Sequence, residues 1–143
     1  MVEYRIVKIE SKWANGDSHV VYRIEKSFFG WWLNAKIKQG YLLGKLHGGM
    51  SDIMIRDDSY TFHKLEDAQR VLNEHLINPY EEYYKGSQII KIIWDCNGKD
   101  VYVNKSFRTG YYASNSCYEY SSSVDYLKSK IDRRVGVVTK TVV

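Results

Sequence analysis

One stretch of the chain, residues 60–76, constrains the fold most strongly because it changes from a strand pattern to a helix pattern. Its aromatic first residues are typical of a short β-strand. The apolar residues that follow recur at helical spacing and form one stripe: Leu65, Ala68, Val71, Leu72 and Leu76. Such a helix is not stable alone in water, so its stripe must pack against neighbouring strands. The stretch therefore predicts an α+β fold.

Turn signals divide the rest of the chain into strands. Asn15-Gly16 and Asn97-Gly98 predict β-hairpins, because Asn and Gly both accept a positive φ. Segments of strand-like composition are expected at residues 4–9, 20–27, 88–94 and 101–107, with further strands within 111–120 and over 137–143. Residues 80–86 are interpreted as an acidic and aromatic linker. Mainly antiparallel sheets are therefore expected.

A second helix is expected to begin after Ser122 or Ser123, because either hydroxyl can cap its first turn. Asp125 is placed to complete a capping box with Ser122. The apolar stripe of this helix is Val124, Leu127 and Ile131. Gly136 favours the end of the helix, since glycine readily adopts the conformation that follows a last helical turn.

The two halves of the chain match in the order of their patterns. Each half has an apolar strand, an Asn-Gly turn, a Lys-Ser-Phe triplet and a helix stripe. We therefore predict a single domain, residues 1–143, built of two degenerate ββ(β)α repeats. The first repeat is residues 1–79 with an insertion at 33–59, and the second is residues 86–143. The antiparallel sheets are expected to be covered by the two helices and closed by a C-terminal strand.

The insertion is the main difference between the two halves, and it is interpreted as a long glycine-rich loop. Long connections of this kind often carry function. A phosphate-binding loop is not expected, because three residues separate Gly40 from Gly44 where that motif needs four, and Leu46 replaces its hydroxyl residue. Residues 53–55 are a candidate edge strand.

The aromatic run Phe28-Phe29-Gly30-Trp31-Trp32 is the most unusual segment. In a continuous strand, Phe29 and Trp31 face one way while Phe28 and Trp32 face the other. The sequence favours packing of these rings in a core. If the tryptophans are exposed instead, the cations around them make the run a candidate binding hot spot. Those cations are Lys26, Lys36, Lys38, Lys45 and Arg56.

Composition and motifs argue against several classes of function. The net charge of +4 is small for a dedicated nucleic-acid-binding protein. No catalytic motif is present, and the four histidines lack metal-ligand spacing. Cys96 and Cys117 are expected to be free thiols. No cofactor, metal or catalytic residue is therefore expected. With neither a signal-peptide pattern nor a long apolar run, the chain is expected in the cytoplasm and without a membrane partner.

Three hypotheses for function remain, and binding is favoured over catalysis. The first is a non-catalytic protein that binds a macromolecule, in the first instance a protein, through the insertion and the Trp31/Trp32 edge. Its candidate partner-binding residues are Trp31, Trp32, Lys36, Lys38, Tyr41, Lys45, His47 and Arg56. The alternative is a nucleic-acid-binding protein with a basic and aromatic surface made by Arg108, Tyr111, Tyr112, Lys128, Arg133 and Arg134. The third is an enzyme with a dispersed site. The oligomeric state stays open.

Some of these patterns resemble those of small accessory proteins of tailed bacteriophages. The resemblance rests on the Tyr4-x-Ile6-Val7 strand, the Phe-Phe-Gly-Trp-Trp run and Phe62 leading into the helix. The chain departs from that pattern at Lys64, which stands where a capping hydroxyl is usual and should cost the helix about 1 kcal/mol. The resemblance covers about half of the chain and implies a host-directed accessory role, with the host cytoplasm as its compartment.

Overall fold

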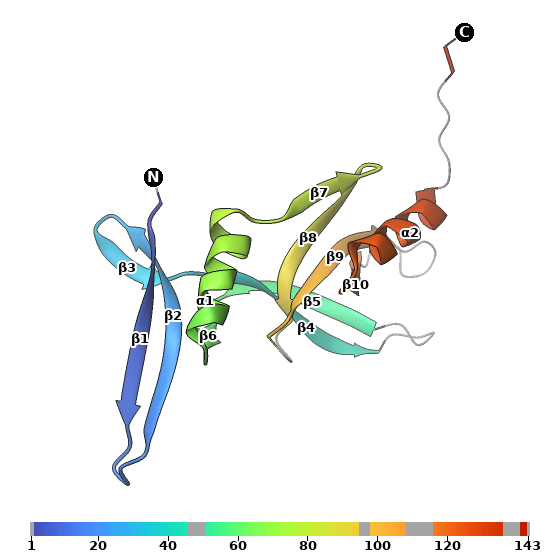
Figure 1. The fold of residues 1–143 in the computed structure, drawn as a ribbon. Helices are drawn as coiled ribbons and strands as arrows, with labels where there is room; N and C mark the ends of the chain where they lie inside the picture. Colours follow the sequence, from blue (N-terminus) through green and yellow to red (C-terminus); the bar gives the residue numbers. More distant parts are fainter. Residues whose placement is uncertain (1, 46–50, 95–97, 108–115, 136–140, 143) are drawn as a thin grey trace. The chain divides into compact units, whose positions relative to one another are not determined.

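The computed structural model describes residues 2–45, 51–94, 98–107, 116–135 and 141–142 of the chain. The chain divides into two compact units (Figure 1). Unit 1 comprises Met1–Gln39 and Arg56–Pro79, and unit 2 comprises Gly40–Ile55 and Tyr80–Val143. The chain therefore leaves unit 1 after Gln39, returns at Arg56 and leaves it again after Pro79. The expected α+β class is confirmed, since both units combine antiparallel strands with helical segments.

Unit 1 is built on a long antiparallel hairpin. Its elements are β1 (Tyr4–Lys12), β2 (Ser18–Phe28), β3 (Trp31–Asn34), β6 (Thr61–Phe62), α1 (Leu65–Val71) and the π-helix η1 (Leu72–Ile77). The strand order is β1-β2-β3, and β6 also pairs with β2. The core side chains come from several of these elements, with Ile24, Phe62, Ala68 and Val71 all buried.

Unit 2 is a larger sheet that includes strands from the inserted segment. Its elements are β4 (Ile37–Lys45), β5 (Ser51–Asp58), β7 (Glu81–Tyr84), β8 (Ser87–Trp94), β9 (Asp100–Phe107), β10 (Ser116–Ser121) and α2 (Val124–Val135). The first residues of β4 and the last of β5 belong to unit 1. The strand order is β10-β9-β8-β4-β5, and β7 pairs with β8. Figure 1 shows α2 beside β9 and β10, and Leu127 and Ile131 of α2 pack on Ile89 of β8.

Both hairpins predicted from Asn-Gly turns are confirmed. At the β1–β2 turn, the Gly16 N–H donates to the Trp13 carbonyl at 3.0 Å and the Trp13 N–H donates to the Asp17 carbonyl at 2.8 Å. Gly16 has a φ of +93°, which few other residues tolerate. At the β8–β9 turn, the Trp94 N–H donates to the Lys99 carbonyl at 2.8 Å. Residues 95–97 of that turn lie outside the described residues.

The helix predicted after residue 64 is present, but its second half is π-helical. The Asn78 N–H donates to the Asn73 carbonyl at 3.0 Å, which is the i→i−5 bond of that geometry. A π-turn rotates the side chains that follow it, and the predicted apolar stripe is only partly realised. Ala68 and Val71 are buried, Leu65 is 41% exposed, and Leu72 and Leu76 are half-buried. As expected, Lys64 caps α1 without a side-chain hydrogen bond.

The second predicted helix is confirmed by its cap and its stripe. The Tyr126 N–H donates to the Ser123 hydroxyl at 3.3 Å, so Ser123 rather than Ser122 caps α2. Leu127 and Ile131 are fully buried, and Val124 packs against the same cluster. Gly136, the predicted end of the helix, lies outside the described residues.

The interpretation of residues 34–58 as a glycine-rich loop was wrong, because most of the segment is β4 and β5. The candidate edge strand over residues 53–55 is confirmed within β5, which ends the sheet order of unit 2. Ile53 is buried with Ile92 and Val103. Gly40 serves a close approach of β4 to its neighbours rather than flexibility. A Cβ atom there would lie 2.7 Å from Ile92 Cδ1.

One further expectation differs from the structure, and another falls largely outside the described residues. The predicted linker over residues 80–86 is a strand, β7, joined to β8 by a turn at Lys85 and Gly86 with φ of +49° and +81°. The predicted closing strand over 137–143 falls largely outside the described residues. Thr141 and Val142 are exposed and belong to no strand.

Candidate functional site

The aromatic run forms a tight hairpin at one end of the unit 1 sheet. Phe28 ends β2 and pairs with Trp31, the first residue of β3, so the turn consists of Phe29 and Gly30 alone. Their φ angles are +47° and +82°, the positive pair that a two-residue type I′ turn requires. Phe29 is therefore an aromatic residue in a left-handed conformation that Asn, Asp and Gly usually occupy.

The side chains around this turn are exposed, which corrects the expectation that they pack in a core. Phe29 is 88% exposed, Trp31 73%, Phe28 55% and Leu33 53%. The rings of Phe28 and Phe29 meet edge to face, with centroids 4.6 Å apart. We call these four residues the aromatic hairpin. So large an apolar surface on one short hairpin is unusual for a surface that meets only water.

The turn also changes which aromatic residues share a face of the sheet. Phe28 and Trp31 are directly opposite each other, and so are Lys26 and Leu33. Opposed residues in an antiparallel pair point to the same side, so Phe28 and Trp31 share one face. The expectation from a continuous strand, which separated them, was wrong because the chain reverses at Phe29-Gly30.

Trp32 lies on the opposite face of the sheet from Trp31. The Arg5 guanidinium lies over its ring at 4.2 Å from the centroid, and Arg5 also forms an ion pair with Glu25 at 2.8 Å. Trp32 is half-buried in this arrangement. The predicted Trp31/Trp32 edge is thus split, with Trp31 presented to solvent and Trp32 packed under Arg5.

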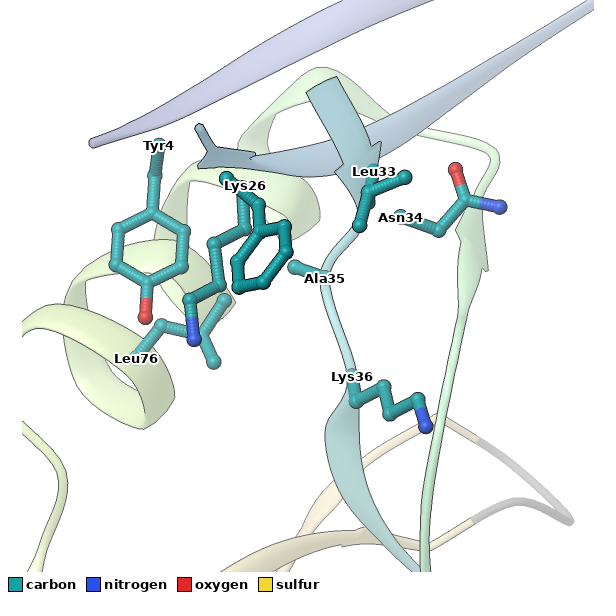
Figure 2. A pocket seen from close by; sticks show the side chains of 8 residues that line it. Tyr4, Lys26, Leu33, Asn34, Ala35, Lys36 and Leu76 are labelled. Atoms are coloured by element: carbon teal, nitrogen blue, oxygen red, sulfur yellow. The ribbon is translucent and has the colours of Figure 1, made fainter. Parts of the chain in front are cut away.

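A pocket of about 250 Å³ adjoins the aromatic hairpin within unit 1 (Figure 2). Its apolar lining comes from Phe28, Leu33, Ala35 and Leu76. Its polar lining comes from Tyr4, Lys26, Asn34 and Lys36. Figure 2 shows the side chain of Lys26 running beside Tyr4, with the ammonium group and the phenol hydroxyl at the same end. The pocket is therefore lined by apolar side chains together with two lysines and two uncharged polar residues.

The other predicted partner-binding residues belong to different parts of the chain. Lys38 pairs with Asp57 at 3.3 Å, and Arg56 is exposed in unit 1. Tyr41 is half-buried and belongs to unit 2. His47 and the side chain of Lys45 lie outside the described residues. Among the members of this set that the structure describes, Lys36 lines the pocket, next to the aromatic hairpin that contains Trp31.

The residues of the nucleic-acid alternative are only partly described. Lys128 forms an ion pair with Glu82 at 2.6 Å and lies over the Tyr84 ring, so its ammonium group is paired within unit 2. Arg133 is exposed. Arg108, Tyr111, Tyr112 and the side chain of Arg134 lie outside the described residues. No basic and aromatic surface is assembled by the residues that remain.

A network of charges and phenols joins β7 to α2 in unit 2. Lys85 pairs with Asp132 at 2.5 Å, and the Tyr84 hydroxyl donates to Asp132 at 2.8 Å. These partners hold the pKa of Asp132 below its usual value. The Tyr80 hydroxyl donates to Glu82, and burial together with this bond raises the pKa of Tyr80 to about 12. The tyrosines of this network pack on the cluster of Ile89, Leu127 and Ile131. The pKa shifts of Asp132 and Tyr80 therefore follow from structural contacts between β7 and α2.

Comparisons with known proteins leave the site to be judged on its geometry. No protein-family model, curated protein or solved structure matches this chain. Within the described residues, no group of three or more His, Cys, Asp or Glu side chains is arranged to hold a metal ion. None of the helices formed by these residues has the length and apolar character needed to cross a membrane.

Several residues of the site were not predicted from the sequence. Phe28, Phe29 and Leu33 were not assigned a partner-binding role. Tyr4 and Leu76 line the pocket although they are far from the hairpin in sequence. A usable signal was present for the hairpin. Gly30 divides two short aromatic segments, and a glycine at the second turn position is compatible with a two-residue hairpin. Leu76 carried no such signal, because its place depends on the π-helical turn of η1.

Proposed function

We propose that this chain is a non-catalytic binding protein that holds a protein partner with the aromatic hairpin and its adjoining pocket. The carrying observation is that Phe28, Phe29, Trp31 and Leu33 are all more than half exposed on one short hairpin. Aromatic side chains supply much of the energy at protein interfaces, because they bury a large area at a small cost in conformational entropy.

The backbone of Phe29 supports the proposal independently. Its φ of +47° is one that an aromatic residue adopts only at a cost, and its ring is too exposed to recover that cost by packing. Local strain that gives no stability in return is common where function selects the side chain. Phe29 is therefore better explained by a contact with a partner than by the needs of the fold.

Ion pairing of three cations favours a protein over a nucleic acid as partner. Arg5, Lys38 and Lys128 are each engaged in an ion pair within their own unit. Strong binding of a phosphate backbone requires several cations that can replace counterions together. The exposed aromatic surface, in contrast, is large relative to the few cations beside it.

The resemblance to bacteriophage accessory proteins supports a protein of the bacterial host as the partner. The strand over residues 4–7, the aromatic run and the Phe62 segment carry that resemblance. All of these segments belong to unit 1, the unit that carries the aromatic hairpin.

We also infer that the two halves of the chain arose by duplication of a hairpin, a third strand and a helix. Unit 1 has β1, β2, β3 and α1 in that order, and unit 2 has β8, β9, β10 and α2. The two Lys-Ser-Phe triplets occupy equivalent places, since one ends β2 and the other ends β9. The inserted β4–β5 segment then distinguishes the first copy from the second.

The proposal predicts that a partner protein is captured by the aromatic hairpin and not by exposed aromatic residues in general. The full chain would be immobilised and incubated with nuclease-treated bacterial lysate, alongside a Phe29→Asn/Trp31→Thr variant. The variant should lose the captured protein. Trp13→Thr is the matched control, because Trp13 is 64% exposed at the other hairpin turn of unit 1.

The captured protein would then be purified and its affinity measured by calorimetry. Loss of two interface aromatics should weaken binding by roughly a hundredfold or more. Equal binding by the wild type and the Phe29→Asn/Trp31→Thr variant would contradict the proposed site. A signal that disappears on nuclease treatment would instead support the nucleic-acid alternative.

A further inference from the structure

The side chains that line the pocket beside the aromatic hairpin restrict which side chain of a partner protein can bind there. Four apolar side chains line it, from β2, β3, η1 and the segment after β3. At about 250 Å³ it is smaller than typical drug-sized ligand sites, and its size suits one large side chain. Phe28 and Leu33 belong both to this lining and to the aromatic hairpin, so an occupant would contact both surfaces at once.

The charges at the pocket have one sign. Lys26 and Lys36 both line it and are exposed, and the described part of the lining contains no carboxylate. Within the described part of the chain, neither lysine forms an ion pair, unlike Lys38 nearby in the sequence, which pairs with Asp57. Two such ammonium groups repel a cationic partner and attract an anionic one.

Tyr4 adds a polar group to the same pocket. Its hydroxyl lies at the same end as the Lys26 ammonium (Figure 2), where it can donate or accept a hydrogen bond, whereas the Asn34 amide points away from that ammonium. The lining thus combines apolar side chains with hydroxyl and ammonium groups that can donate to oxygen atoms.

We infer that the pocket takes one aromatic or large aliphatic side chain from an acidic segment of the partner protein, with the flanking carboxylates on Lys26 and Lys36. The inference rests on the proposed function and specifies the partner's contact segment. The apolar side chain supplies the burial, and the carboxylates supply orientation and faster association.

The test uses the ¹⁵N-labelled full chain and the peptide acetyl-Glu-Glu-Trp-Glu-Glu-amide. We expect chemical-shift changes at Leu33, Ala35 and Leu76 that saturate as the peptide is added. Two further peptides isolate the two parts of the recognition, one with Gln in place of every Glu and one with Ser in place of Trp. Each should bind more weakly than the parent peptide.

Charge variants of the chain provide the matched comparison. Lys26→Gln/Lys36→Gln should weaken binding of the parent peptide roughly five- to tenfold, since exposed ion pairs contribute little individually. Lys12→Gln/Lys64→Gln removes the same charge from exposed positions outside the pocket and should bind like the wild type. All four positions are exposed, so folding should not decide the result.

The outcomes separate this inference from the proposed function. Equal binding of the Glu and Gln peptides, or equal loss with both lysine pairs, would overturn the acidic-segment inference. The acidic-segment inference would also be overturned if the parent peptide failed to bind. If capture of the partner from lysate still depended on Phe29 and Trp31 in that case, the proposed function would stand. Binding of phosphatidylglycerol vesicles in place of the peptide, lost in Phe29→Asn/Trp31→Thr, would also overturn it and assign the hairpin to a lipid surface.

Discussion

At the scale of single residues, Phe29 shows a conflict between local backbone preference and side-chain identity. A type I′ turn needs a positive φ at both of its central positions, and Gly30 meets this need without cost. Phe29 meets it at a φ of +47° with its ring 88% exposed. A more suitable turn residue at this position would improve the hairpin and remove the most prominent aromatic group of the candidate site.

Replacing Phe29 by Asn should therefore stabilise the chain while weakening partner binding. Relief of the left-handed strain is worth about 1 kcal/mol, and loss of the edge-to-face contact with Phe28 should offset only part of it. Urea unfolding followed by circular dichroism would measure the change. Trp31→Thr serves as the comparison, because it removes an exposed ring without relieving any turn strain. A lower unfolding midpoint for Phe29→Asn than for the wild type would refute this account of the turn.

At the scale of elements, the ion pairs between β7 and α2 hold a strand and a helix that are distant in sequence. Lys128 of α2 pairs with Glu82 of β7, and the Tyr80 hydroxyl donates to the same carboxylate. Both contacts favour the charged form and hold the pKa of Glu82 below its usual value, with the Lys128 bond the larger cause. Beneath them, Leu127 and Ile131 pack on Ile89 of β8, the strand that pairs with β7, so polar contacts hold α2 to β7 and apolar contacts hold it to β8.

The docking of α2 should weaken in acid as a result. A carboxyl whose folded pKa is lowered contributes stability above its ordinary value, 4.5 for Glu82, and loses it as the pH falls through the folded value. Glu82→Gln should be less stable than the wild type at pH 7 and should lose less stability on acidification. Urea unfolding at pH 7 and below pH 4.5 would measure both effects. Glu3→Gln, an exposed carboxylate of unit 1, should change neither, and an unaltered pH dependence in Glu82→Gln would contradict the assignment.

At the scale of the whole molecule, the route of the chain makes folding of the second half of the sequence depend on strands from the first half. Unit 2 includes Gly40–Ile55 from the first half of the sequence as well as Tyr80–Val143. Ile53 of β5 is buried in the same cluster as Ile92 of β8 and Val103 of β9. A division of the sequence into a first and a second repeat therefore does not divide the molecule into two folding units.

A fragment of residues 80–143 should consequently fail to fold by itself. Without β4 and β5, the cluster around Ile92 and Val103 loses its contacts with Ile53 and Ile55, and apolar surface is exposed. The proton–nitrogen spectrum of the fragment should show poor dispersion, in contrast to the full chain. Adding residues 1–79 as a separate fragment should restore dispersion if the missing strands are the cause. A well-dispersed spectrum from residues 80–143 alone would show that β4 and β5 are dispensable.

Local sequence signals predicted the elements whose geometry depends on near neighbours. Asn15-Gly16 and Asn97-Gly98 mark hairpins because φ preferences act within a turn, and the stripe of Leu127 and Ile131 marks α2 because helical spacing acts within a helix. The aromatic run was recognised as unusual for the same reason. Trp31 and Lys36 were assigned to a binding surface from residue type alone, before the neighbours that complete it could be identified.

The sequence by itself thus determined the α+β class, the hairpins and the second helix, whose interactions lie within a few residues. Only the tertiary structure decided that residues 34–58 include two strands of the unit 2 sheet, since the pairing of β4 with β8 joins segments far apart in the chain. It also decided which rings face solvent. The exposure of a side chain depends on whether other elements of the fold pack against it. The sequence pattern of Phe28, Phe29 and Trp31 would be the same in either case.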